Sequence, residues 1–173
     1  ADEDTDLPAS VLYATVTRAH ELYRAGRFLA DASKLRRVID LPEDLDGFTG
    51  EDKKHIEALL RKARAAGVHK GYVASHRKEW WSVALYEPAP ILATYMARRP
   101  PGFVRNTSAA RHINIAHGIY PREHMSDKKL TALAEHLATH TSLADGRTYA
   151  GGLTKFEPKE MERLLVPAPE MLS

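Results

Sequence analysis

The sequence lacks cysteine, and it lacks any apolar run approaching the roughly 20 residues that a membrane-spanning helix needs. Without cysteine the chain can form neither a disulfide scaffold nor a thiolate zinc site, and this composition agrees with a reducing compartment. A signal peptide is not indicated either, because residues 1–8 are acidic rather than basic and then apolar. We therefore expect a cytoplasmic protein with no membrane partner.

The common catalytic motifs are also missing. No serine lies in a nucleophile elbow, and the sequence has neither a phosphate loop ending in Lys-Ser or Lys-Thr nor a Gly-x-Gly-x-x-Gly turn. His136 and His140 have the i, i+4 spacing of a helical metal site, but Glu135 precedes His136 and no third ligand is recognisable. We expect no catalytic residue and no metal ligand, and a metal-dependent nuclease is kept as an alternative.

The chain has 173 residues, of which 43% are apolar, enough for one domain of ordinary size with an appendage. It starts without methionine, and Asp2, Glu3, Asp4 and Asp6 make its start acidic. We expect a C-terminal fragment of a longer enzyme.

Positive charge is concentrated in the middle of the sequence. Residues 68–122 carry eight Lys or Arg and two acids, a net charge of +6, whereas residues 1–67 and 123–173 each have a net charge of −2. Such an excess is the electrostatic footprint of a surface that meets phosphates, and it is also compatible with a merely solvated basic face.

Apolar spacing and proline punctuation predict the order helices, sheet, helices. Residues 9–25, 31–39 and 51–66 have helical periodicity, which makes the first 67 residues helical. Short aromatic and β-branched runs at 80–86, 91–96, 102–104 and 112–115 predict strands.

Residues 126–140 return to helix, with Ser126 as the N-cap. We expect an α+β fold in which a helical N-terminal segment is followed by an irregular, bent, mixed or antiparallel sheet with flanking helices. The predicted domains are a helical connector over 1–67 and a second domain over 68–173.

The C-terminal stretch combines a double glycine with a helix start. Gly151 and Gly152 predict a tight turn or a backbone that approaches a ligand such as phosphate. Pro158 is suited to the first position of a helix, and Met161, Leu164 and Leu165 would form its packing face.

Basic side chains alternate with aromatic and amide side chains in the middle of the chain. Arg and Lys can neutralise phosphates, Asn can pair with adenine, and an aromatic ring can stack on a base. Of Trp80 and Trp81, strand alternation would turn one inward and one outward, without deciding which.

Several segments together resemble the C-terminal specificity region of adenine-specific DNA methyltransferases of the Taq type and Eco57I type. They are Arg77–Trp81, Pro90–Leu92, Phe103–Asn106, Asn114–Pro121 and Gly151–Pro167, in that order. The resemblance covers roughly residues 68–167, and it implies a target recognition domain for double-stranded DNA that follows a catalytic domain in the same polypeptide.

The family's Asn-Pro-Pro-aromatic motif and its glycine-containing turn for S-adenosylmethionine are both absent here. The resemblance therefore implies that the parent protein binds S-adenosylmethionine and transfers the methyl group in a restriction-modification system, whereas this chain holds no cofactor and serves recognition. One local departure is Thr139–Ser142, where relatives often have Asn-Ser.

On this interpretation we expect a set of DNA contacts chosen by residue type: Lys78, Trp81, Arg98, Arg99, Arg105, Asn106, Arg111, Asn114 and Lys155. A further alternative is a protein-interaction module that uses the two tryptophans and the proline-rich turns.

Overall fold

The computed structural model describes residues 6–172, so Asp2, Glu3 and Asp4 of the acidic start lie outside the described residues. The chain forms two compact units: unit 1 contains residues 6–13 and 37–85, and unit 2 contains residues 14–36 and 86–172. Helices and both parallel and antiparallel strand pairs are present, so the fold is α+β as expected. The division into residues 1–67 and 68–173 stays a prediction.

Unit 1 is built around one long helix and a small apolar core. The buried members of this core are Leu7, Val11, Leu41 and Ile56. Its elements are η1 (Ala9–Val11), α2 (Gly50–Ala65), η2 (Val68–Lys70) and α3 (Tyr72–Ser75), and β1 (Leu12–Val16) and β3 (Arg36–Ile39) each run across the boundary into unit 2.

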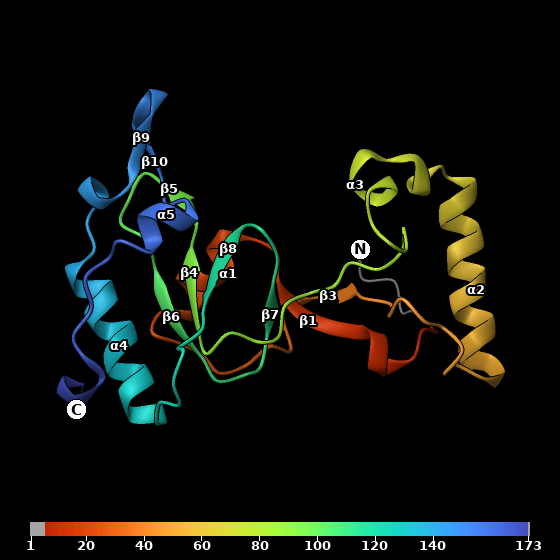
Figure 1. The fold of residues 1–173 in the computed structure, drawn as a ribbon, viewed down its shortest axis with the longest axis horizontal. Coiled ribbons are helices and arrows are strands. Elements are labelled where there is room, and N and C mark those ends of the chain that lie inside the picture. Colours follow the sequence, from red (N-terminus) through yellow and green to blue (C-terminus); the bar gives the residue numbers. More distant parts are fainter. Residues whose placement is uncertain (1–5, 173) are drawn as a thin grey trace. The chain divides into compact units, whose positions relative to one another are not determined.

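Helix α2 confirms the helix predicted over 51–66 (Figure 1). Ile56 points into the core while the other side of the helix is charged, and Gly67 follows with a left-handed φ of 78° that a side chain would oppose. Both signals are local, which is why the sequence predicted this helix well.

The helix predicted over 9–25 is confirmed only over Ala19–Ala25, and the helix predicted over 31–39 is wrong. Residues 12–16 form strand β1, and helix α1 begins at Ala19 and ends at Ala25. At the start of this helix the Glu21 carboxylate accepts the N–H groups of Thr17 and Arg18. Residues 36–39 form β3, and Asp31 closes a turn with the N–H of Ser33 instead of capping a helix.

Unit 2 centres on a four-stranded mixed sheet in the order β2-β6-β4-β8. Strand β6 pairs parallel with β2, whereas β4 pairs antiparallel with β6 and β8. The strands are β2 (Phe28–Leu29), β4 (Ile91–Thr94), β6 (Phe103–Asn106) and β8 (Ala116–Ile119), and β7 (Arg111–His112) pairs parallel with β1 in a separate sheet of order β3-β1-β7.

Helix α4 (Asp127–His140) lies beside β6, as Figure 1 shows. Ser126 caps it by accepting the N–H of Lys129, as predicted. The buried face of α4 consists of Leu130, Leu133, Ala134 and Leu137, and it packs against the sheet residues Ile91, Ala93 and Phe103.

Unit 2 contains a second sheet, in which the strands have the order β5-β10-β9. Its strands are β5 (Met96–Ala97), β9 (Arg147–Tyr149) and β10 (Leu153–Lys155), all antiparallel. The 3-10 turns η3 (Leu143–Asp145), η4 (Ala150–Gly152) and η5 (Pro169–Met171) and the short helix α5 (Pro158–Met161) complete the unit.

The helix start at Pro158 is confirmed, but the predicted packing face is wrong at Leu165. Met161 and Leu164 pack on the core of unit 2, whereas Leu165 is 89% exposed because α5 ends after a single turn. The strand predicted over 80–86 is also absent, since the Asp40 carboxylate occupies the N–H groups of Val83, Ala84 and Leu85.

The strands predicted over 91–96, 102–104 and 112–115 are found with shifted bounds. Of the residues 112–115, His112 ends strand β7 and the others belong to the turn that leads into β8. No helix within residues 6–172 has the length and apolar content that a membrane span requires.

Candidate nucleic-acid interface

The sheet β5-β10-β9 presents one basic face. In its register Lys155 is opposite Arg147, and Leu153 is opposite Tyr149, so these four side chains lie on the same side of the sheet. Thr154 is opposite Thr148 on the other side and is buried. We name this side the hairpin face and define it by Arg147, Tyr149, Leu153, Lys155 and Met96, which is opposite Lys155, together with Arg98, which follows β5 and bonds to the hairpin tip.

The tip of the β9–β10 hairpin is formed by Ala150, Gly151 and Gly152, so it carries no side chain larger than a methyl group. Gly151 and Gly152 have φ values of 76° and 70°, which L-residues rarely adopt, and this confirms the tight turn predicted at the double glycine. The Arg98 Nε donates a 3.1 Å hydrogen bond to the Gly151 carbonyl oxygen. This contact ties an exposed guanidinium to the hairpin tip.

Lys155 is held in place by its surroundings and stays protonated. Its Nζ lies 2.7 Å from the Glu157 Oε1 and 5.0 Å from the centre of the Tyr95 ring. The hydrogen bond to Glu157, followed by that to Tyr95, raises the pKa of the Lys155 ammonium well above its usual value. The side chain is therefore a fixed positive charge at all physiological pH values.

Arg147 supplies the neighbouring charge. Its Nη2 donates to the Glu160 Oε1 at 3.1 Å, and the negative charge of Glu160 raises the pKa of the guanidinium further. The Glu160 side chain is mostly buried, whereas that of Arg147 is 55% exposed. The buried Glu160 carboxylate thus orients the Arg147 guanidinium, and about half of the Arg147 side chain remains exposed to solvent.

Arg99 lies next to Arg98 but stacks on a ring. Its guanidinium carbon is 3.4 Å from the centre of the Tyr23 ring, and the side chain remains exposed. Stacking orders the arginine without neutralising its charge.

Arg105 and Asn106 are buried instead of facing solvent. The Arg105 Nη1 donates to the carbonyl oxygens of Pro90 and Asn106, and Nη2 pairs with Asp127 at 2.5 Å. The Asn106 amide donates to the carbonyls of Ala89 and Ala110. Both side chains hold the backbone of unit 2 together in this structure.

The other candidates are distributed over both units. In unit 2, Arg111 donates to Glu87 at 3.2 Å and Asn114 is exposed in the turn after β7. In unit 1, Lys78 pairs with Glu43 at 2.5 Å, a hydrogen bond that raises the lysine pKa, and the Trp81 Nε1 donates to the Pro42 carbonyl. Trp81 is half-buried against the core of unit 1.

Of the nine predicted residues, the structure therefore brings together Arg98 and Lys155 on the hairpin face, with Arg99 adjacent in sequence. Sequence reasoning missed Arg147 and Tyr149. Their signal was available: the alternation of residues 147, 149, 153 and 155 around the double glycine is that of a two-residue period in a hairpin.

His136 and His140 stack with their ring centres 4.1 Å apart, and the His140 Nδ1 lies 2.9 Å from the His136 carbonyl oxygen. Among residues 6–172 no three His, Asp or Glu side chains are grouped as a metal site would require. A cavity of about 410 Å³ lies in unit 2 beside α4, lined mainly by apolar groups of Phe28, Phe103, Ala134 and Ala138, with the Arg27–Glu135 ion pair in its wall.

Comparison with known proteins connects the chain to one family. The sequence model described as "Type II methyltransferase M.Eco57I, C-terminal domain" matches residues 23–173. Type II methyltransferase M.XamI of Xanthomonas campestris pv. amaranthicola is 54% identical over 166 residues, which are 96% of this chain and 32% of that protein.

Type II methyltransferase M.AccI of Acinetobacter calcoaceticus is 26% identical over 115 residues, 64% of this chain and 21% of that protein. The chain thus spans about a third of the length of its curated relative M.XamI. No solved structure matches.

Proposed function

The chain belongs to the family of Type II methyltransferase M.Eco57I C-terminal domains, and on that premise we propose that it is the DNA target recognition part of an adenine-N6 methyltransferase in a restriction-modification system. Its partner is double-stranded DNA, and its own share of the reaction is to hold a short site while another domain of the same polypeptide transfers the methyl group.

The observation that carries this proposal is the hairpin face. Arg147 and Lys155 lie on one side of the paired strands β9 and β10, and Arg98 directly follows β5 and bonds to the hairpin tip, so that each can neutralise a phosphate. Strands β9 and β10 form a hairpin, and a two-stranded ribbon of this kind is narrow enough for the major groove of B-DNA, which is about 12 Å wide. The glycine tip adds no side chain that would prevent close approach.

The cofactor belongs to the parent protein in this proposal. S-adenosylmethionine would supply the methyl group there, bound by a glycine-containing turn between a strand and a helix. In this chain the double glycine Gly151–Gly152 instead joins two antiparallel strands. The residues of this turn therefore do not fit that cofactor.

Neither alternative gains support from a specific observation. A metal-dependent nuclease would need a third ligand beside His136 and His140, and none is grouped with them in residues 6–172. A protein-interaction module based on the tryptophans would need free indole faces, but Trp81 donates to Pro42 and lies edge-on to Trp80 at 5.7 Å.

The test is fluorescence anisotropy of a labelled random-sequence duplex over a salt series, with single-stranded DNA for comparison. We expect duplex binding with a steep salt dependence. Changing Arg98 and Arg99 together to Gln lowers the log–log salt slope by about 1.8, because each lost phosphate contact removes about 0.9.

The matched control changes Arg122 and Lys128 to Gln, which removes the same charge from exposed positions of unit 2 that lie outside the hairpin face. The control slope stays that of the parent. Recovery of bound duplexes from a random pool then yields a short site that contains adenine. Absence of duplex binding at low salt, or recovery of no preferred sequence, contradicts the proposal.

A further inference from the structure

Unit 1 carries a second concentration of positive charge, which begins at the last turns of α2 and ends after α3. We name it the 61–78 segment. It contains six cations and no acid. The cations are Arg61, Lys62, Arg64, Lys70, Arg77 and Lys78.

Most of this charge is directed to solvent. Lys62, Arg64 and Lys70 are exposed, and within residues 6–172 the structure gives Lys62 and Lys70 no carboxylate partner. Two cations of the segment are paired with acids outside it: Arg61 is 3.8 Å from Glu57, and Lys78 is 2.5 Å from Glu43. A clear positive excess remains on the surface.

Helix stabilisation explains only part of this pattern. Lys62 and Arg64 lie in the last turn of α2, where positive charge suits the helix dipole. Lys70 and Arg77 lie in η2 and beyond α3, outside that helix, so the dipole gives no reason for them. Their concentration without any acid requires another explanation.

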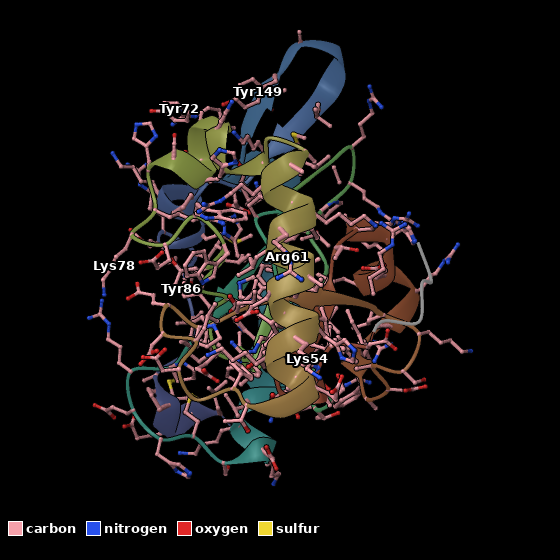
Figure 2. The ribbon with its side chains drawn as sticks, turned by 90° about the vertical axis from the view of Figure 1, so that its right-hand side faces the viewer. Lys54, Arg61, Tyr72, Lys78, Tyr86 and Tyr149 are labelled. Carbon is pink, nitrogen blue, oxygen red and sulfur yellow. The ribbon has the colours of Figure 1, made fainter. Side chains whose placement is uncertain are left out.

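Exposed apolar side chains lie within the same segment. Tyr72 is 79% exposed, and Figure 2 shows its side chain at α3. Val73 is 63% exposed, and the ring centres of Tyr72 and His76 are 4.3 Å apart. An exposed tyrosine is one of the side chains that contact DNA phosphates and sugars. Side-chain amides and carboxylates, which read adenine and cytosine edges, are absent from residues 61–78.

We propose that the 61–78 segment is a DNA-binding surface in its own right, which contacts the sugar-phosphate backbone of duplex DNA and adds affinity without reading bases. This inference rests on the proposed function, because it assumes that the chain binds duplex DNA. It differs from that function in assigning backbone contacts to unit 1, apart from the hairpin face of unit 2.

The experiment compares two double variants of the whole chain. One changes Lys62 and Lys70 to Gln, and the control changes Lys53 and Lys54 to Gln, two exposed lysines of α2 outside the segment. Binding to a random-sequence duplex is measured across a salt series. We expect the first variant to lose about 1.8 from the log–log salt slope, and the control to keep the parent slope.

Two outcomes separate this inference from the proposed function. In the first outcome, the Lys62 and Lys70 variant keeps the parent salt slope while the Arg98 and Arg99 variant has a reduced slope. The 61–78 segment is then not a DNA contact, so this inference is wrong while the proposed function stands. If the parent chain does not bind duplex DNA, both fall. Equal losses in the Lys53 and Lys54 control would show an effect of net charge and would also overturn the inference.

A single charge reversal provides a second readout at Lys70, which lies outside helix α2. Lys70→Glu should weaken binding more than Lys70→Gln and to the same degree for every duplex sequence, because a backbone contact carries no sequence information. A loss confined to particular sequences would overturn the assignment of the surface to the backbone.

Discussion

The carboxylate of Asp40 accepts a 2.9 Å hydrogen bond from the backbone N–H of Ala84, a residue with a left-handed φ of 54°. The same carboxylate accepts the N–H groups of Val83 at 3.1 Å and of Leu85 at 2.8 Å. A non-glycine residue in this conformation is strained by about 1–3 kcal/mol, and the three bonds hold it there. The end of unit 1 is thereby shaped by one side chain 43 to 45 positions earlier.

Asp40→Ala should lower the free energy of unfolding by about 1–3 kcal/mol, since hydrogen bonds to a charged acceptor contribute more than neutral ones and three donors lose their partner together. Urea denaturation monitored by tryptophan fluorescence measures this. Asp44→Ala is the control, because this change removes the same charge from a carboxylate that accepts the N–H of Asp46, a residue two positions away. Equal losses for the two variants would show that the three-bond arrangement has no special importance.

Gly146→Ala should destabilise unit 2 by about 1–3 kcal/mol through overpacking. A Cβ at this position would lie 2.5 Å from the Thr154 Cγ2 and 2.8 Å from the Phe156 ring, both of them buried. The control is Gly47→Ala, where a Cβ meets nothing within 4 Å. The midpoints of thermal unfolding should fall for Gly146→Ala and stay unchanged for Gly47→Ala; a Gly146→Ala midpoint equal to that of the parent would contradict the close packing.

Stability should depend on pH through His112. Burial, together with the neighbouring His117, lowers the pKa of His112 below its usual value of 6.5. Below pH 6.5 the imidazole of His112 therefore binds a proton in the unfolded chain but stays neutral in the folded chain. The stability that neutral His112 contributes is present above pH 6.5 and is lost as the pH falls toward the lowered pKa.

The measurement is the free energy of unfolding between pH 7.5 and about 5, for the parent and for His112→Gln. We expect the parent to lose stability more steeply below pH 6.5 than the variant, which has no titrating group there. Identical slopes would show that the folded chain binds the proton as readily as the unfolded one.

Arg105→Ala should lower stability by about 2–4 kcal/mol, because the change removes a buried cation together with its hydrogen bonds to the Pro90 and Asn106 carbonyl oxygens. The partner Asp127 is almost fully exposed and returns to water at little cost. Denaturation by urea tests the loss.

The same variant should leave the salt slope of DNA binding at the parent value, measured where the variant is fully folded. Arg98→Ala should do the reverse, with a reduced slope and a small change in stability, because Arg98 is exposed. A reduced slope for Arg105→Ala would show that its guanidinium reaches the DNA after all.

Part of the fold was predictable because its signals are local. The N-cap at Ser126 and the apolar spacing of residues 51–66 and 126–140 lie within a few residues of where they act, and both long helices were predicted for this reason. The turn at Gly151 and Gly152 was found for the same reason, since its φ values exclude most other residues.

Strand β1 shows why other parts were missed. Its residues have apolar spacing compatible with a helix, but Thr15 pairs with Arg111 almost a hundred positions away. A strand has no hydrogen bonds of its own, so its formation depends on partners that periodicity within one window does not reveal.

The sequence by itself determined the family, the α+β class, the two long helices and the presence of a basic, aromatic middle region, because these follow from composition, motifs and local backbone preferences. Only the tertiary structure decided which cations are available to a ligand. Arg105 and Asn106 have the right chemistry for DNA but are surrounded by backbone carbonyls, whereas Arg147 was overlooked until strand pairing placed it beside Lys155. The physical reason is that burial and neighbouring charges are set by contacts between distant segments.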